Sequence, residues 1–332
     1  MNFKEIPDII YPRNYNLIKN IHECNSNNLD LNIIIYYLSK NKIKIIIRRL
    51  DEEIGWNEQI SIKLYDINKN KYELIECGSC NFIEKKINII TQIKIYKEEY
   101  KKTLIPKFIY QTYENNKYQN LLHYNSVQSF IDYNPNYTYE FFDDKKCEKF
   151  LKDDFEEYVY KTYTRLYPSA YKADLFRYCL MYIKGGCYFD NKYIPRVSLD
   201  NIIGENDKSL LCLDTGEDLM FNSLIIVIPK QEYFIDLIKN ISFNVINNFY
   251  GLCPLHPTGP RLFFEYTQSE NISFKHVVKN PKKDYKNSFV ILLNNKKIVF
   301  NTHYKGYYYN KNHRNKDKND YTKLWKTKKI YI

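Results

Sequence analysis

Residues 171–192 read Tyr171-Lys-Ala-Asp-Leu-Phe-Arg-Tyr-Cys-Leu-Met-Tyr-Ile-Lys-Gly-Gly-Cys-Tyr-Phe-Asp190-Asn-Lys192. Apolar side chains recur at helical spacing through the first part of this stretch. Gly185-Gly186 is a strong stop signal, because a helix end often needs a residue with positive φ. The next three residues have the character of a short buried strand, which ends at Asp190. Open α/β sheets bind their ligands at such strand ends, so the stretch predicts a helix and a strand that carry one site.

Asp174 and Arg177 are three residues apart and therefore share a helical face, distinct from the apolar stripe. Together with Asp190 they form a set of two carboxylates and one guanidinium that suits a sugar nucleotide. Without the flanking stretch, the same pair would indicate only an ordinary ion pair on a helix surface, which contributes little to stability.

The composition describes a globular chain with a basic excess. Of its 332 residues, 44% are hydrophobic and 27% are charged, which is enough for one large or two modest domains. The net charge is +11, partly because residues 301–332 are rich in lysine. Such a charge suits a nucleic acid, an anionic sugar nucleotide or an acidic acceptor. We expect no nucleic-acid partner.

The cysteines and the lengths of the apolar runs indicate in which cellular compartment the protein resides. Eight cysteines are scattered, and only Cys77 and Cys80 have the spacing of metal ligands, with no second pair to complete a zinc site. The N-terminus lacks the pattern of a signal peptide, and the longest apolar runs, Ile33–Leu38 and Ile43–Ile47, are too short to span a bilayer. These features predict a soluble, cytoplasmic protein with reduced cysteines and no membrane span.

Residues 1–100 have the pattern of a β-rich, sandwich-like N-terminal domain. Short Ile-rich segments, often alternating, are separated by turn residues, and no convincing helix interrupts them. The expected strands are residues 31–38, 42–48, 59–65, 72–76 and 86–96.

Residues 101–332 alternate between strand and helix patterns, which is typical of an α/β domain. Asp143-Asp144 is expected to cap a helix, while residues 153–164 look irregular and the last thirty residues show no clear period. The expected strands are 108–111, 137–142, 187–189, 209–212, 224–227, 290–293 and 297–300, and the expected helices are 117–132, 145–150, 171–184, 232–241 and 261–268.

Several ordered motifs resemble glycosyltransferase family 32. Ile105-Pro-Lys-Phe-Ile-Tyr-Gln-Thr-Tyr113 looks like the opening strand of that family, and Asn134-Pro-Asn-Tyr-Thr-Tyr-Glu-Phe-Phe-Asp-Asp144 resembles its second strand. Lys172-Ala-Asp-Leu-Phe-Arg-Tyr178 with Gly185-Gly-Cys-Tyr-Phe-Asp190 resembles the central signature. Thr258-Gly-Pro260 and His303 match later positions. The resemblance covers roughly residues 104–305 and implies a GT-A-like nucleotide-diphospho-sugar transferase domain with a Rossmann-like mixed sheet. The preceding strands resemble a β domain found before such transferases in large DNA viruses and some protists.

The resemblance implies an enzyme that moves a hexose from a UDP- or GDP-sugar to a hydroxyl of a glycan or protein acceptor, with retention of configuration. Tyr110 and Tyr113 would flank the nucleobase, and Asp174 would bind hydroxyls of the donor sugar. Arg177 would pair with Asp174 or a phosphate, and Asp190 would face the ribose and a metal ion. The other donor-side residues implied are Gln111, Tyr188 and Asn222, and Asn222 could instead hold the acceptor.

An acidic loop after an apolar strand offers a general base for the alternative, inverting reaction. The candidates are Asp214, Glu217 and Asp218, of which we select Asp218. Each could equally be a surface residue of the loop.

The chain departs from the family at one position. The Asp-X-Asp motif of the family holds Mn²⁺ or Mg²⁺, which bridges the diphosphate. Here the motif reads Asp190-Asn-Lys192, and a protonated lysine cannot ligate a cation. Three outcomes are open: a metal bound through Asp190, His303 or another carboxylate together with the diphosphate, a positive charge supplied by Lys192 itself, or lost activity. The last would leave a sugar-nucleotide- or carbohydrate-binding protein on the same fold.

Overall fold

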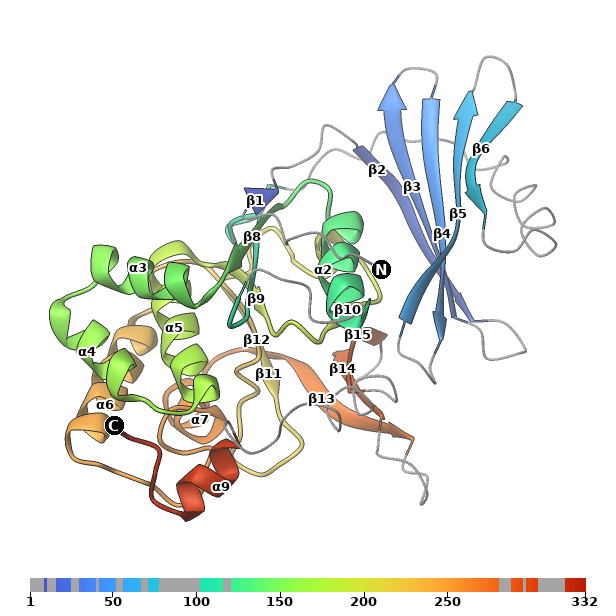
Figure 1. Ribbon diagram of the computed structural model, residues 1–332. Coiled ribbons are helices and arrows are strands. Elements are labelled where there is room, and N and C mark those ends of the chain that lie inside the picture. The colour runs from blue at the N-terminus through green and yellow to red at the C-terminus, as the bar shows by residue number, and fades with distance from the viewer. Residues whose placement is uncertain are drawn as a thin grey trace.

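The computed structural model describes residues 9–10, 16–24, 30–39, 42–51, 56–66, 71–77, 102–115, 121–280, 288–294, 297–303 and 320–332 (Figure 1). Within these ranges the chain forms a mixed α/β fold around a large sheet, as the alternation of patterns predicts. None of the helices in the described ranges is long and apolar enough to cross a bilayer.

The large sheet places the strand that ends before Asp190 near its centre. This strand, β9 (Gly186–Phe189), runs parallel to β7 (Phe108–Thr112) on one side and antiparallel to β12 (Leu224–Val227) on the other. In the described ranges the strand order is β1-β8-β7-β9-β12-β11-β13-β14-β15-β10. The remaining strands are β1 (Ile9–Ile10), β8 (Thr138–Phe142), β10 (Ile194–Pro195), β11 (Ser209–Leu213), β13 (Ile272–Asn280), β14 (Ser288–Leu293) and β15 (Lys297–His303).

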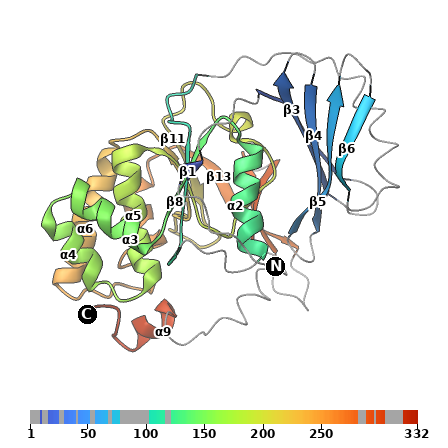
Figure 2. The same cartoon turned by 45° about the horizontal axis from the view of Figure 1, so that its top comes forward.

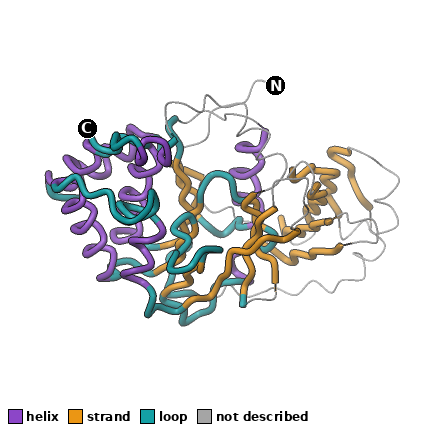
Figure 3. The backbone as a smooth tube through the Cα atoms, turned by 90° about the horizontal axis from the view of Figure 1, so that it is seen from below, coloured by secondary structure: helices purple, strands orange, loops and turns teal. Residues whose placement is uncertain are grey.

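Helices cover the two faces of the sheet unequally (Figures 1 and 2). One face carries α2 (Leu121–Tyr133). The other carries a layer of helices, which Figure 3 shows gathered beside the strands: α3 (Asp144–Asp154), α4 (Glu157–Arg165), α5 (Ser169–Lys184), α6 (Glu232–Ile246) and α7 (Pro260–Thr267). Asp143 caps α3 as expected, accepting a hydrogen bond from the backbone N–H of Lys146 at 2.9 Å.

The strand side chains alternate between two buried clusters, as the period of two in a strand requires. Cys187 and Phe189 of β9 belong to the cluster on the α2 face, whereas Tyr188 belongs to the cluster with α5. In β7, Ile109 and Tyr110 divide in the same way. By this alternation Asp190 follows Tyr188 toward α5, the helix that carries Asp174 and Arg177.

The junction between α5 and β9 depends on glycine. Gly185 has φ of +60°, and a Cβ there would lie 2.5 Å from the backbone nitrogen of Pro229. Its N–H donates to the Met181 carbonyl and closes the helix. The predicted glycine stop is therefore confirmed.

One prediction for this part of the chain is wrong, and two elements were not predicted. Residues 157–165, expected to be irregular, form α4, whose buried side is Val159, Thr162 and Tyr163. The sequence reading also missed β13 and the short helix α9 (Tyr321–Lys326), whose N-terminus Asp320 caps. Helix α4 is amphipathic but rich in tyrosine and β-branched residues, and α9 is braced by residues near Tyr250, far away along the chain.

Strands β2 to β6 form a separate antiparallel sheet in sequence order. Four of the expected strands are confirmed, and the fifth, residues 86–96, lies outside the described residues. The division into a domain of residues 1–100 and a domain of residues 101–332 stays a prediction. The five strands are β2 (Asn16–Cys24), β3 (Asp30–Ser39), β4 (Lys42–Asp51), β5 (Trp56–Asp66) and β6 (Lys71–Cys77).

Candidate active site

The backbone of Asp190 is fixed between the strands on both sides of β9. Its N–H donates to the Ser223 carbonyl at 3.0 Å, just before β12. Its carbonyl accepts from Nε2 of Gln111 at 3.2 Å, at the end of β7. The N–H of Tyr193 also donates to this carbonyl, which closes a turn. The Asp190 side chain is thereby held at the sheet edge and stays 26% exposed.

Two cations flank the Asp190 carboxylate. Nη2 of Arg177 lies 3.4 Å from Oδ1, and Nζ of Lys192 lies 3.6 Å from Oδ2. The Arg177 side chain is only 6% exposed, whereas that of Lys192 is 19% exposed. The cluster therefore has a buried cation beneath the carboxylate and a more accessible cation beside it.

Asp174 is buried, and each of its carboxylate oxygens accepts a hydrogen bond. Nδ2 of Asn222 donates to Oδ1 and Oγ1 of Thr258 donates to Oδ2, both at 2.8 Å. Burial raises the pKa of the Asp174 carboxyl to about 6, while the nearby Arg177 guanidinium, 3.6 Å away, acts in the opposite direction. The interpretation of Asp174 and Arg177 as an ordinary helix-surface pair is wrong, because both side chains lie in the interior.

Arg177 joins this cluster to the sheet. Its Nη1 donates to the Asn222 carbonyl at 2.9 Å, and its guanidinium lies 4.8 Å from the centroid of the Tyr188 ring. Because Tyr188 is itself buried, its ring packs against the guanidinium and restricts the position of Arg177. Asn222 contacts the cluster through both its backbone and its side chain.

The residues expected to flank a nucleobase lie in two environments. Tyr110 is 1% exposed and packs between Phe108 and Phe142, because alternation in β7 turns it toward the covering helices. Its ring could not stack on a base without leaving the core, so that part of the expectation needs correction. Tyr113 is half-buried against the His123 ring and stays a candidate for stacking.

Gln111 is fully buried and acts on the site indirectly. Its amide nitrogen donates to the Asp190 carbonyl, and its amide oxygen accepts from the Tyr139 hydroxyl at 2.9 Å. Gln111 therefore holds the backbone of Asp190 in place. It has no exposed group that could contact a nucleotide.

The structure does not bring Asp218 into contact with the Asp190 cluster. Asp218 has φ of 53°, and its Oδ2 accepts from Nη1 of Arg261 at 2.9 Å on an exposed surface. Asp214, from the same loop, turns inward instead: its Oδ1 lies 2.8 Å from Nδ1 of His276.

Sequence reasoning missed His276 as part of this region. Nε2 of His276 lies 3.0 Å from the Thr302 hydroxyl, and the Phe221 ring stacks on the imidazole at 4.2 Å. Phe221 immediately precedes Asn222, so His276 helps fix the segment that holds Asp174. In the sequence, Thr258 belongs to the Thr-Gly-Pro motif. Nothing in the spacing of residues predicts its contact with Asp174.

The donor set around Asp190 does not fit a divalent cation. Mn²⁺ and Mg²⁺ take several oxygen ligands, but each Asp190 oxygen faces a cationic side chain and each Asp174 oxygen already accepts a hydrogen bond. In the part of the chain that the structure describes, no three His, Cys, Asp or Glu side chains gather as potential ligands. The His303 side chain lies outside the described residues.

One protein family, two curated proteins and one solved structure are similar to parts of this chain. Residues 120–209 match the family described as "Glycosyltransferase sugar-binding region containing DXD motif". The mannosyl phosphorylinositol ceramide synthase of Saccharomyces cerevisiae is 28% identical over 42% of this chain and 35% of its own length. An uncharacterized glycosyltransferase of Acanthamoeba polyphaga mimivirus is 30% identical over 37% of this chain and 40% of its own length. The solved PaToxG glycosyltransferase gives a TM-score of 0.40 at 14% identity, over 50% of this chain and 69% of that structure.

The matched region contains the strand β9 and the charged cluster at its end. The chain is therefore similar, over residues 120–209, to glycosyltransferases with the DXD-containing sugar-binding region. It spans about two fifths or less of the length of the two curated relatives.

Proposed function

We propose that this protein transfers a hexose from a UDP- or GDP-sugar to a hydroxyl group of a glycan or protein acceptor. The observation that carries the proposal is the cluster of Arg177, Asp190 and Lys192 at the end of β9, inside the matched sugar-binding region. A strand end of this kind is where α/β sheets bind nucleotides.

Lys192 would supply the positive charge that the reaction needs. When the bond between the sugar and the diphosphate breaks, negative charge grows on the leaving phosphate. An ammonium about 4 Å from a phosphate contributes on the order of 1–4 kcal/mol, depending on the local dielectric. Lys192 is the more accessible of the two cations in this cluster, so it is the side chain assigned to the diphosphate. No step of this proposal passes through a metal ion.

Asp174 and Asn222 would act as positioning residues. Their side chains are buried and bonded to each other, and Asp174 is also bonded to Thr258. Their role would be to hold Arg177 and the start of β12 beneath the donor. Asp190, partly exposed, is then the carboxylate assigned to hydroxyl groups of the donor.

Retention of configuration is part of the proposal and comes from the family resemblance. Asp218 would be needed as a base only for inversion, and its carboxylate pairs with Arg261. NMR assignment of the anomeric configuration in the first product formed tests this choice, since an inverted product would require a different base.

Incubation with a panel of UDP- and GDP-sugars, followed by measurement of released nucleoside diphosphate, tests the activity. We expect release from at least one donor and its loss in Asp190→Asn. The matched control is Asp207→Asn, which changes a carboxylate that binds only the nearby Gly204 N–H.

A second candidate function is donor binding without turnover. The observation that favours it is the engagement of both Asp190 oxygens by cations, which could block the carboxylate from a reacting sugar. Calorimetry that shows binding of a nucleotide sugar, unaffected by Asp190→Ala and without product, would select this alternative.

A further inference from the structure

The end of α6 and the loop after it expose several large apolar side chains. Phe243, Ile246 and Leu252 are 62%, 66% and 78% exposed, and Phe249 is 39% exposed. In the described part of the chain, four of the eleven large apolar side chains that are exposed fall within these ten positions. Surface apolar residues are normally scattered, so such a group marks an interaction surface. We call these four residues the apolar end.

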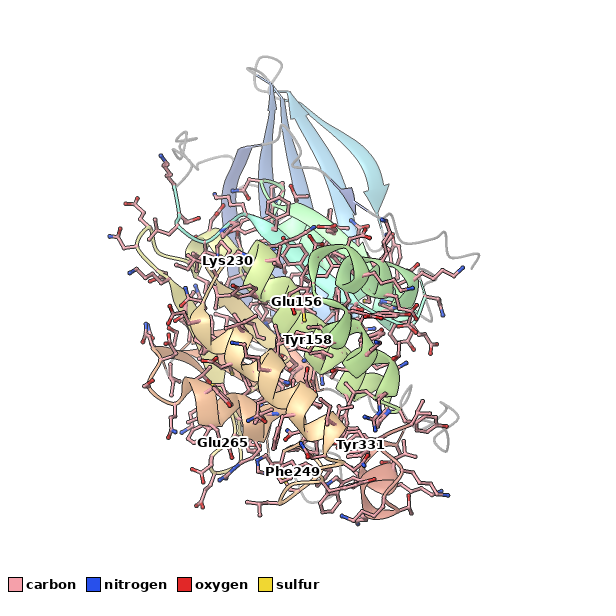
Figure 4. All side chains as sticks on the ribbon, turned by 90° about the vertical axis from the view of Figure 1, so that its left-hand side faces the viewer. Glu156, Tyr158, Lys230, Phe249, Glu265 and Tyr331 are labelled. Atoms are coloured by element: carbon pink, nitrogen blue, oxygen red, sulfur yellow. The ribbon has the colours of Figure 1, made fainter. Side chains whose placement is uncertain are left out.

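The apolar end is held by a segment far away in the sequence. The Tyr331 hydroxyl donates to the Phe249 carbonyl, and Nε1 of Trp325 donates to the Tyr250 carbonyl at 2.6 Å. Figure 4 shows Phe249 and Tyr331 close together at the same end of the helical layer. The exposed side chains therefore project from a braced surface.

Lysines line one side of this surface, on the segment that braces it. Lys323, Lys326, Lys328 and Lys329 are all exposed, on α9 and the turn that follows it. Nζ of Lys328 lies 4.0 Å from the centroid of the Tyr250 ring, directly beside the apolar end. Between residues 320 and 332 the one acidic side chain is Asp320, which caps α9. This segment, which we call the lysine rim, is therefore strongly positive.

We propose that the apolar end and its lysine rim dock on an anionic lipid surface. Apolar side chains of a monotopic protein enter the boundary between headgroups and acyl chains, while lysines are attracted to anionic headgroups. A second copy of this chain is a poor occupant, because two lysine rims would repel each other. An uncharged partner would leave the lysine rim without a role.

The docking surface is linked to the site at Asp190 by one short stretch of chain. The residues after Leu252 include Pro254, whose carbonyl accepts from the Tyr171 hydroxyl of α5, and Thr258, which binds Asp174. Docking would therefore place the proposed donor site near a membrane. The docking proposal rests on its own residues and stands independently of the proposed activity.

Cosedimentation of the full chain with vesicles tests the proposal. We expect binding to vesicles of phosphatidylcholine with phosphatidylserine, little binding to phosphatidylcholine alone, and weakening with added salt. Each lysine near the surface contributes about fivefold to partitioning. Lys326→Gln with Lys328→Gln should reduce binding about 10- to 30-fold, and Phe243→Ser with Leu252→Ser should nearly abolish it.

Two matched variants serve as controls, and both should bind as the unmodified chain does. Ile272→Ser changes an apolar side chain that is 41% exposed on another element, and Lys208→Gln changes an exposed lysine before β11. Equal binding to both kinds of vesicle, no binding to either, or equal losses in the controls would each overturn the proposal. A concentration-dependent dimer that Phe243→Ser with Leu252→Ser dissolves would assign the surface to a second copy and overturn it as well.

Discussion

Nζ of Lys192 lies 3.6 Å from one oxygen of the Asp190 carboxylate, while Nη2 of Arg177 lies 3.4 Å from the other. The carboxylate at the end of β9 is thus neutralised on both sides by the chain itself. In a motif with two aspartates, the second carboxylate would add negative charge at this point and favour a divalent cation. Here Lys192 adds a positive charge at this point instead, so the site has less need of a cation.

Lys192→Ala should therefore weaken the reaction. Loss of a cation near the diphosphate should lower kcat/KM about 5- to 900-fold, because the lost interaction is of the order of 1–4 kcal/mol. Steady-state release of nucleoside diphosphate gives the value. The control is Lys208→Ala, an exposed lysine away from β9, which should leave the rate unchanged. Equal rates in the two variants would remove Lys192 from the mechanism.

Lys192→Asp should make the protein more responsive to metal. The substitution restores an Asp-X-Asp pattern and creates a second oxygen donor next to Asp190. We expect the ratio of activity with Mn²⁺ to activity with EDTA to rise relative to the unmodified chain. Lys192→Asn, which removes the cation without adding a carboxylate, is the control. An equal ratio in both variants would contradict this account of the position.

Most of the fold could be predicted from the sequence because periodic burial is local. The helix of residues 171–184, the glycine stop and the strand before Asp190 each have a pattern readable within a few residues. Strand β13 was missed because the alternation of Ile272-Ser-Phe-Lys continues with His276, a buried polar residue, and the strand depends on pairing with β11 and β14. Helix α4 was missed because its Tyr-Val-Tyr-Lys-Thr-Tyr run suits a strand as well as a helix.

The candidate site was predictable only where its residues share one segment. Arg177, Asp190 and Lys192 come from one continuous stretch, so their proximity follows from a helix that turns back into a strand. The contact of Thr258 with Asp174 joins residues 84 positions apart. The burial of Tyr110 likewise depends on which face of β7 the helices cover, and strand alternation alone cannot decide that.

Asp174 should make stability depend on pH. Its carboxyl has a pKa of about 6 when folded against an ordinary value of 3.8, mainly because it is buried. Between these values the folded chain holds a proton that the unfolded chain has released, so its contribution to stability falls as pH rises. At about 1.36 kcal/mol per pH unit, the contribution falls by about 3 kcal/mol. It is fully present below pH 4 and lost by about pH 6.

Urea unfolding at several values between pH 4 and pH 7 measures this change. The free energy of unfolding of the unmodified chain minus that of Asp174→Asn should fall steadily, by about 3 kcal/mol, over that range, because asparagine does not titrate. Thr164→Val, at an exposed position on α4, changes no titratable group and should give a pH profile parallel to that of the unmodified chain. A constant difference for Asp174→Asn would show that the buried carboxyl is not titrating there.

Thr258→Val should destabilise the fold through Asp174. The substitution keeps the shape but removes one of the two hydrogen bonds to a buried carboxylate, which costs about 1–3 kcal/mol. Thermal or urea unfolding at neutral pH gives the value. Thr164→Val changes a threonine on the exposed side of α4, whose hydroxyl binds only its own helix backbone. If the two variants unfolded alike, the Thr258 hydroxyl would not be supporting Asp174.

The most direct test of the central claim is turnover of the nucleotide sugar in the presence of EDTA. The account assigns the diphosphate charge to Lys192, beside Asp190 and Arg177, so release of nucleoside diphosphate should continue at nearly the same rate after chelation. It should also fall sharply in Lys192→Ala under the same conditions. Complete loss of turnover on chelation, restored by added Mn²⁺, would contradict the account.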